Sequence, residues 1–173
     1  TSPSRTWTST GVSKGRSERL LIVDDDPASR RLLEVRLRPL ECDVTTAVNG
    51  EQALSAIRKD PPDLVLLDLQ MPKMGGIEVL RALRKEEIEV PTIVITAHGS
   101  IESAVEAMRY GACDYLLRPF DNETLELAIG RVFAVRDVLQ ARDFLQQEVD
   151  RGWEGLVGRS AALQRVRVMV EQV

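Results

Sequence analysis

The feature that most constrains this chain is a regular alternation between short apolar runs and segments with helical periodicity. Each of five apolar runs is followed by a segment in which apolar residues recur every three or four positions. The runs occupy residues 20–23, 42–48, 63–67, 91–96 and 113–120. Such alternation predicts βα units, which build a parallel sheet with helices on both faces. The sequence therefore predicts an α/β fold.

The intervening segments predict five helices, in residues 27–40, 50–59, 77–85, 100–111 and from 121 to about 150. Pro27 suits a first helical position and Asp26 before it suits an N-cap, while Gly111 suits a helix end. The run at 42–48 alternates and is rich in β-branched residues, so we expect an edge strand there.

Composition narrows the possible classes of protein. A length of 173 residues with 43% apolar residues allows one domain of ordinary size plus an extension. The net charge of −4 gives no general reason to expect affinity for nucleic acid or bilayers. No apolar stretch reaches the roughly 18 residues of a membrane span. The cysteines, Cys42 and Cys113, fall in strand-like runs and are expected to be a buried, reduced pair in a cytoplasmic protein.

Polar residues follow four of the predicted strands. Residues 24–26 are all aspartate, Asp68 follows the third strand, Thr96 ends the fourth, and Arg118 lies near the end of the fifth. Turn formation or helix capping explains one or two such residues, but parallel strands bring all of them to one edge of the sheet. Crowded carboxylates need a cation or a retained proton. A few oxygen ligands with open positions suit Mg²⁺.

The segments that carry these residues resemble a known family. "LLIVDDDPASRRLL", "DLVLLDLQMPKMGGIEVLRALR" and "PTIVITAHGSIESAVEAMRYGACDYLLRPF" resemble the receiver domain of two-component response regulators, from about Arg19 to Arg136. The resemblance implies a five-stranded parallel sheet with strand order 2-1-3-4-5, as in flavodoxin and CheY. It also implies phosphoryl transfer from a sensor histidine kinase, with residues 19–120 as the receiver core.

The resemblance also assigns roles at the acidic edge. Asp68 is implied as the phosphoacceptor. Asp24, Asp25, Asp68 and the backbone carbonyl of Gln70 are implied as ligands of Mg²⁺. A carboxylate that attacks phosphorus needs such a cation to mask its charge.

The resemblance also implies residues that change conformation in response to the phosphoryl group. Thr96 is implied to contact the phosphoryl group and Tyr115 to change rotamer with it. Arg118 stands where the family usually has lysine, and it is expected to contact the phosphoryl group with altered coupling or lifetime. The Arg118-Pro119 peptide bond is expected to be cis. Gln70 and His98, the only histidine, are candidates for tuning hydrolysis, with an ordinary exposed loop position as the alternative for His98.

The helical pattern after residue 120 is longer than a final receiver helix needs. We expect it to extend through residues 121–151 and to form a parallel homodimer through residues 121–150, the alternative being a long helix packed on its own domain. The face made by the fourth helix, fifth strand and fifth helix is a second candidate dimer surface. The predicted seam has steps of three and four residues and weakens at its two polar members; it comprises Leu125, Ala128, Val132, Val135, Leu139, Arg142, Gln146 and Val149.

The two ends of the chain differ from its centre. Residues 1–18 are Ser/Thr-rich and are expected to be a disordered lead-in or a vector-derived remnant. Glycines at 152, 155 and 158 are expected to end the long helix. Residues 152–173 resemble the opening of the AAA+ domain of sigma-54-dependent activators, which implies a regulatory fragment or natural truncation of such an activator, or else a C-terminal tail. No Walker A loop and no basic helix-turn-helix occurs, so neither ATPase activity nor nucleic-acid binding is expected of this chain.

Three functions fit these patterns. The first is a phosphorylation-controlled switch that is not itself an enzyme and governs an attached ATPase. The second is a stand-alone receiver whose coiled-coil tail docks on a partner protein. The third is a Mg²⁺-dependent phosphatase, which turns over many substrate molecules where a receiver stops at one phosphoryl group per chain.

Overall fold

The computed structural model describes residues 17–157, with side chains described as far as residue 147. The chain divides into two compact units, Thr1–Val132 and Phe133–Val173. The first unit contains one five-stranded parallel sheet in the order β2-β1-β3-β4-β5, as predicted. The strands are β1 (Arg19–Val23), β2 (Asp43–Ala47), β3 (Leu64–Leu67), β4 (Thr92–Thr96) and β5 (Asp114–Leu117).

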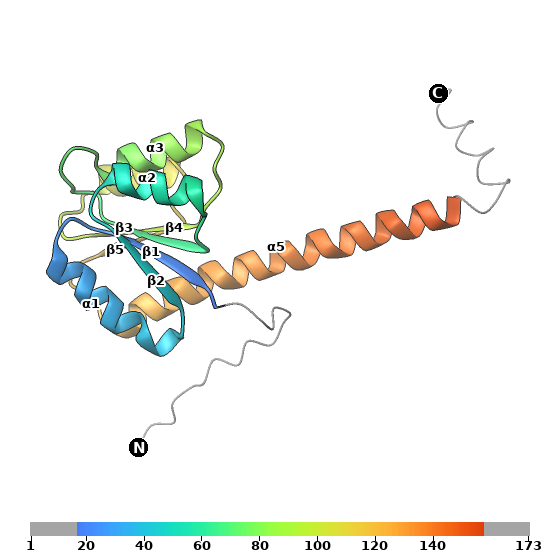
Figure 1. Ribbon diagram of the computed structural model, residues 1–173, viewed down its shortest axis with the longest axis horizontal. Helices are drawn as coiled ribbons and strands as arrows, with labels where there is room; N and C mark the ends of the chain where they lie inside the picture. Colours follow the sequence, from blue (N-terminus) through green and yellow to red (C-terminus); the bar gives the residue numbers. More distant parts are fainter. Residues whose placement is uncertain (1–16, 158–173) are drawn as a thin grey trace, which may run out of the picture. The chain divides into compact units, whose positions relative to one another are not determined.

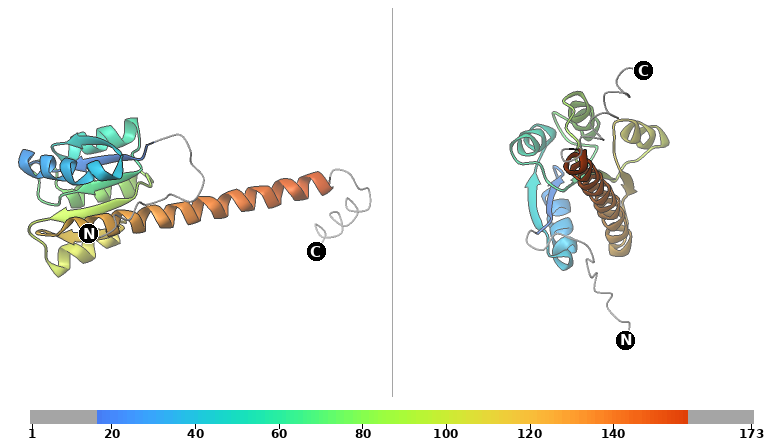
Figure 2. Two further views of the ribbon diagram at one scale, coloured as in Figure 1. Left: turned by 90° about the horizontal axis from the view of Figure 1, so that it is seen from below. Right: turned by 90° about the vertical axis from the view of Figure 1, so that its right-hand side faces the viewer.

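Helices cover both faces of this sheet (Figure 1). Figure 2 shows α2, α3 and α4 on one face, and α1 with the first turns of α5 on the other. The helices are α1 (Pro27–Leu37), α2 (Gly50–Lys59), α3 (Gly76–Lys85), α4 (Ile101–Arg109) and α5 (Asn122–Val157). The predicted doubly covered α/β architecture is therefore confirmed.

The core explains why the central strands are continuous apolar runs. Every residue of β3 and β4 is buried, as are four of the five residues of β1. Alternate side chains of a strand point to opposite faces, so a strand covered on both sides needs apolar residues throughout. The edge strand β2 has only one buried residue, as expected from its alternating sequence.

Local capping fixes the start of α1 beside the end of β1. Asp26 is the N-cap, and its carboxylate accepts hydrogen bonds from the backbone N–H groups of Ala28 and Ser29 at 3.3 and 2.9 Å. Pro27 occupies the first helical position, where no intrahelical donor is lost. Both predictions are confirmed.

Several element ends differ from expectation. The helix predicted for residues 27–40 ends at Leu37, and Arg38–Leu40 form a 3₁₀ turn, η1, because Pro39 has no N–H to continue the α-helical pattern. Glu41 then adopts a left-handed conformation with φ of 51°. The fifth strand ends at Leu117 instead of reaching Pro119.

The long last helix, α5, spans 36 residues. The prediction that Gly152 and Gly155 end it is wrong, because the helix runs to Val157; a helical glycine costs only about 1 kcal/mol relative to alanine. Gly158 and the remainder of the expected AAA+ opening lie outside the described residues, as do residues 1–16 of the predicted lead-in.

The proposed seam is also corrected at its start. Leu125, Ala128 and Val132 are buried in the first unit, with 1, 0 and 8% of their surface exposed. A side chain inside its own domain cannot line an intermolecular seam. In contrast, Val135, Val138 and Leu139 are exposed. Any helix pairing must therefore begin after Val132.

The cysteine prediction is wrong in part. Both cysteines are free, but Cys42 is only half-buried and Cys113 is exposed. Each precedes its strand by one residue, so neither side chain belongs to the doubly covered interior. Within residues 17–157, no helix combines the length and the apolar character that a membrane crossing requires.

Candidate functional site

The carboxyl ends of β1 and β3 bring three carboxylates together. Asp24 and Asp68 are buried, with 1 and 8% of their surface exposed, whereas Asp25 is exposed. One oxygen from each of the three side chains can be chosen so that all lie within 4.8 Å of one another. This acidic cluster lies where parallel sheets usually bind ligands, at the carboxyl end of the strands.

Asp24 is held from several directions. Its Oδ1 accepts a hydrogen bond from the Asp26 backbone N–H at 2.9 Å, and its Oδ2 forms a 2.7 Å ion pair with Arg118. Its backbone carbonyl accepts a hydrogen bond from Arg30 at 2.6 Å. Asp24 is therefore a fixed member of the cluster, with one cation already against it.

Asp68 has much weaker support. Its Oδ1 is buried and has no hydrogen-bond partner among the described residues. Burial, followed by the nearby charge of Asp24, raises the pKa of Asp68; the Gln70 and Leu69 backbone N–H groups and the Arg118 charge oppose this shift. An ionised carboxylate in this position lacks counter-charge, which a bound cation or a positive ligand can supply.

Gly76, the first residue of α3, lies directly against the Asp68 backbone. A Cβ atom placed there would lie 2.3 Å from the Asp68 carbonyl oxygen and 2.9 Å from Leu69 Cα. Because both neighbours are backbone atoms, they cannot turn aside as a flexible side chain can. Glycine thus permits the close packing of α3 against the end of β3.

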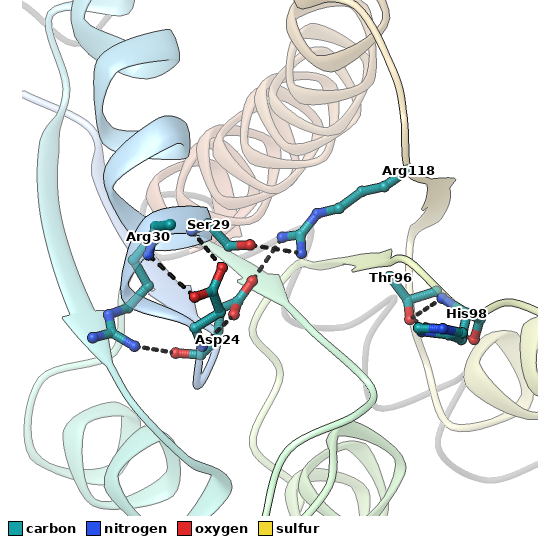
Figure 3. A network of polar contacts seen from close by, with 8 residues as sticks. Asp24, Ser29, Arg30, Thr96, His98 and Arg118 are labelled. Atoms are coloured by element: carbon teal, nitrogen blue, oxygen red, sulfur yellow. Dashed lines mark hydrogen bonds and ion pairs between the residues drawn. The ribbon is translucent and has the colours of Figure 1, made fainter.

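Arg118 connects the fifth strand to the acidic cluster. One guanidinium nitrogen pairs with Asp24, and the other donates a hydrogen bond to Ser29 Oγ at 3.3 Å (Figure 3). The side chain is 22% exposed. The cis peptide bond predicted at Arg118-Pro119 is confirmed.

Thr96 and His98 form a separate group in Figure 3. Thr96 is fully buried at the end of β4, and its hydroxyl donates to the His98 carbonyl at 3.4 Å and accepts from the His98 N–H at 3.3 Å. His98 itself is exposed, and these contacts involve its backbone. The structure thus places Thr96 at the expected strand end, with its hydroxyl occupied by the following loop.

Tyr115 is partly buried and packs against the core. Its hydroxyl lies 2.9 Å from Ser103 Oγ on α4. A Cβ atom at Gly99 would lie 2.7 Å from that hydroxyl, so the β4–α4 loop passes directly over the ring. Tyr115 is therefore linked to the start of α4 and to the loop that follows Thr96.

Sequence reasoning missed three residues of this region: Ser29, Arg30 and Ser103. Ser29 and Arg30 follow the N-cap of α1, and Ser103 belongs to the capping box of α4. Their positions in the first helical turn were visible signals of capping, but their contacts with Arg118, Asp24 and Tyr115 depend on tertiary structure. Gln70 is exposed, and the role of its carbonyl stays a prediction.

The donor set fits a hard divalent cation. Three carboxylates converge, they outnumber the single paired arginine, and one buried oxygen lacks a partner. Mg²⁺ prefers oxygen ligands and commonly binds one or two carboxylates while keeping several waters. The Asp68 carboxylate is also a candidate nucleophile, because carboxylates can form covalent intermediates.

Comparisons with known proteins agree with this arrangement. The family model described as "Response regulator receiver domain" matches residues 20–130. The regulatory protein AtoC of Escherichia coli is 37% identical over 136 residues, covering 79% of this chain and 30% of that protein. The luminescence regulatory protein LuxO of Vibrio campbellii is 34% identical over 145 residues, covering 84% and 32%. The chain thus spans about a third of the length of these relatives.

Solved structures give the same result. The receiver domain of the Francisella response regulator 1452 has a TM-score of 0.65 and 29% identity, covering 69% of this chain and 99% of that one. The chemotaxis protein CheY4 of Vibrio cholerae has a TM-score of 0.63 and 31% identity, covering 68% and 99%. The family match, the fold and the acidic strand ends lead to one conclusion: the chain belongs to the response regulator receiver domain family.

Proposed function

We propose that this chain accepts a phosphoryl group on Asp68 from a sensor histidine kinase, and that the modification switches its conformation and dimerisation. The observation that supports this most directly is the buried Oδ1 of Asp68, which has no partner among the described residues and belongs to a cluster of three carboxylates. A buried polar atom without a partner costs free energy unless a ligand satisfies it. Asp68 is therefore the residue we expect to react.

The proposed cofactor is Mg²⁺, bound by Asp24, Asp25, Asp68 and the backbone carbonyl of Gln70. When bound, it neutralises the acidic cluster and the oxygens of the incoming phosphoryl group. In the transfer itself, an Asp68 oxygen forms the new P–O bond while the P–N bond to the kinase histidine breaks. The chain then carries one phosphoryl group until that group is hydrolysed, so we propose a receiver and not an enzyme.

Arg118 and Thr96 are proposed to recognise the transferred group. Arg118 has a guanidinium group already at the cluster, and Thr96 has a hydroxyl at the next strand end. If both gain contacts with the phosphoryl group, the equilibrium shifts toward the conformer in which those contacts form. Tyr115 is proposed to follow Thr96, because its hydroxyl is held by Ser103 and the loop after Thr96 covers its ring.

Gln70 and His98 are proposed to tune hydrolysis of the phosphorylated form. Both residues are exposed and follow the two strand ends that carry Asp68 and Thr96. An exposed imidazole near the site can act as a general base toward water. His98→Ala is then expected to lengthen the lifetime of the phosphorylated chain, and an unchanged lifetime removes His98 from the mechanism.

We propose that phosphorylation changes the formation of a homodimer. In the second unit, the predicted seam continues through the exposed Val135 and Leu139 and weakens at Arg142 and Gln146. The exposed Val138 and Leu145 lie beside these residues on α5 and widen the apolar stripe. In the first unit, Ile101 and Val105 on α4 are 81 and 54% exposed. Apolar surface of this kind favours burial against a second copy.

The wider context is also a proposal. LuxO and AtoC are regulatory proteins about three times as long as the stretch this chain matches. We propose that the parent protein carries a sigma-54 activator ATPase beyond the receiver, and that it is cytoplasmic. The alternative is a stand-alone receiver that signals by docking through its coiled-coil tail, and the parent coding sequence downstream of this chain separates the two.

Phosphorylation is tested with phosphoramidate, a small donor that has the P–N bond of phosphohistidine. Intact mass spectrometry is expected to show the gain of one phosphoryl group with Mg²⁺ and none with EDTA. Asp68→Asn should abolish the gain. Asp43→Asn, an exposed change in β2, is the matched control and should react like the unaltered chain.

Two outcomes contradict the proposal. Labelling that persists in Asp68→Asn rules out this phosphoacceptor, and repeated hydrolysis of an external phosphate monoester, with many molecules cleaved per chain, favours the phosphatase alternative. Sedimentation with and without beryllofluoride and Mg²⁺ then tests dimerisation. An unchanged sedimentation coefficient in a chain that binds both ligands contradicts the dimer switch.

A further inference from the structure

The guanidinium group of Arg118 holds two partners on different elements. Nη2 pairs with Asp24 Oδ2 at 2.7 Å, and Nη1 donates to Ser29 Oγ at 3.3 Å (Figure 3). Asp24 follows β1, whereas Ser29 lies in the first turn of α1. A planar guanidinium can satisfy two acceptors at fixed positions, which the single nitrogen of lysine does less well.

We propose that Ser29 is a positioning residue that holds Arg118 on Asp24, so that Arg118 is a resident counter-ion that Mg²⁺ must displace. This inference rests on the proposed Mg²⁺ site and adds to it a residue that sets its affinity. Arg118 then has two successive partners: Asp24 before the cation binds, and the phosphoryl group after transfer.

The hydrogen bonds of Asp24 support a competition between Mg²⁺ and Arg118 for its carboxylate. Its Oδ1 accepts from the Asp26 N–H and its Oδ2 is paired with Arg118, so both oxygens are occupied in the absence of a cation. Asp24 is 1% exposed, and little water is available to replace a lost partner. A cation that binds through Oδ2 therefore competes with Arg118 for that oxygen and for the negative charge of Asp24.

The position of Ser29 supports its role as a tether. Its backbone N–H donates to the N-cap Asp26 at 2.9 Å, which fixes the first turn of α1 and hence the half-buried hydroxyl. When Arg118 leaves Asp24, it also loses this hydroxyl. The Ser29 contact thus adds to the free energy that Mg²⁺ binding must supply.

The test is the affinity for Mg²⁺, measured by isothermal titration calorimetry without any phosphodonor. Ser29→Ala is expected to tighten binding about two- to tenfold, the range of one modest hydrogen bond. Ser29→Thr keeps the hydroxyl and should bind like the unaltered chain. Ser55→Ala, an exposed serine on α2, is the matched control and should also leave the affinity unchanged.

A double-mutant cycle separates positioning from a direct effect on the helix. In an Arg118→Met background, Ser29→Ala is expected to leave the Mg²⁺ affinity unchanged, because there is no arginine to hold. An equal tightening in both backgrounds overturns the inference. Circular dichroism of each variant checks that the fold is retained.

The remaining outcomes distinguish this inference from the proposed function. If the unaltered chain binds Mg²⁺ and is phosphorylated on Asp68 while Ser29→Ala shows equal or weaker affinity, only the role of Ser29 is wrong. If the unaltered chain neither binds Mg²⁺ nor accepts a phosphoryl group, the proposed function and this inference both fail.

Discussion

Asp68 at the end of β3 and Glu86 at the end of α3 are both carboxylates, but their surroundings change their pKa values in opposite directions. Glu86 forms two hydrogen bonds with Arg58 of α2 on the surface, and this arginine lowers its pKa. Asp68 is buried beside Asp24, and both influences raise its pKa. The surface acid is matched by a cation, whereas the site acid is left short of one. In this domain, a buried carboxylate without a counter-charge, such as Asp68, marks a reactive or ligand-binding site. An exposed carboxylate paired with a cation, such as Glu86, contributes to stability.

The largest change in stability is expected for Arg118→Met, which removes a positive charge from the site and leaves more of its carboxylate charge without a counter-charge. Among the described residues, Arg118 is the cation that pairs with the Asp24 carboxylate, and Asp24 would lose it while remaining 1% exposed. Breaking a fully buried pair costs about 3–5 kcal/mol, and partial exposure of Arg118 reduces our expectation to about 2 kcal/mol. Urea unfolding in EDTA measures this loss, and Mg²⁺ should recover part of it. Equal midpoints for the variant and the unaltered chain would show that the ion pair contributes nothing.

A gain in stability is expected for Asp68→Asn, which removes the buried negative charge that lacks a counter-charge. The raised pKa means that the folded state favours the protonated form of Asp68 and disfavours the ionised form. The stabilisation that comes from this protonated form is therefore present below the unfolded pKa, and it is lost as the pH rises through the folded pKa. In EDTA at neutral pH the variant should therefore unfold at higher urea, by about 1 kcal/mol, the usual scale of one substitution. The difference should shrink as the pH is lowered toward 4. A less stable variant at neutral pH would contradict the electrostatic account.

The smallest effect is expected for Glu86→Gln, which breaks the matched surface pair. Because Arg58 lowers the pKa of Glu86, the stabilisation is present above the unfolded pKa and is lost as pH falls through the folded value. The variant should be slightly less stable than the unaltered chain at neutral pH and indistinguishable from it in acid. Added salt should reduce the difference in stability between the two chains at neutral pH, since salt screens exposed ion pairs. An effect as large as that of Arg118→Met would remove the contrast between the two regions.

Helix pairing can be tested within α5 by a matched pair of variants. Leu145→Asp places a charge on the exposed stripe and should weaken self-association without lowering the stability of the first unit, in which Leu145 takes no part. Gln140→Asp, an exposed change of one charge in the same helix, controls for charge. Sedimentation equilibrium measures the association, and equal association constants would exclude the stripe as the dimer surface.

The sequence was sufficient for the fold and for much of the site, because both follow from local patterns. Five βα units require a parallel sheet, and a parallel sheet brings Asp24, Asp25 and Asp68 to one edge. The contact of Arg118 with Ser29 could not be predicted in this way, because it spans 89 residues and depends on side-chain rotamers. The extent of α5 was misjudged for another reason: glycine disfavours a helix by an amount that a long helix tolerates.

The unequal surroundings of the two thiols have a practical use. Burial raises the pKa of Cys42, while Cys113 is exposed two residues before Tyr115. A maleimide dye at near-neutral pH should therefore attach preferentially to Cys113, since the thiolate is the reacting form. The native chain thus offers an attachment point for a fluorophore close to the proposed switch tyrosine, without any engineered cysteine.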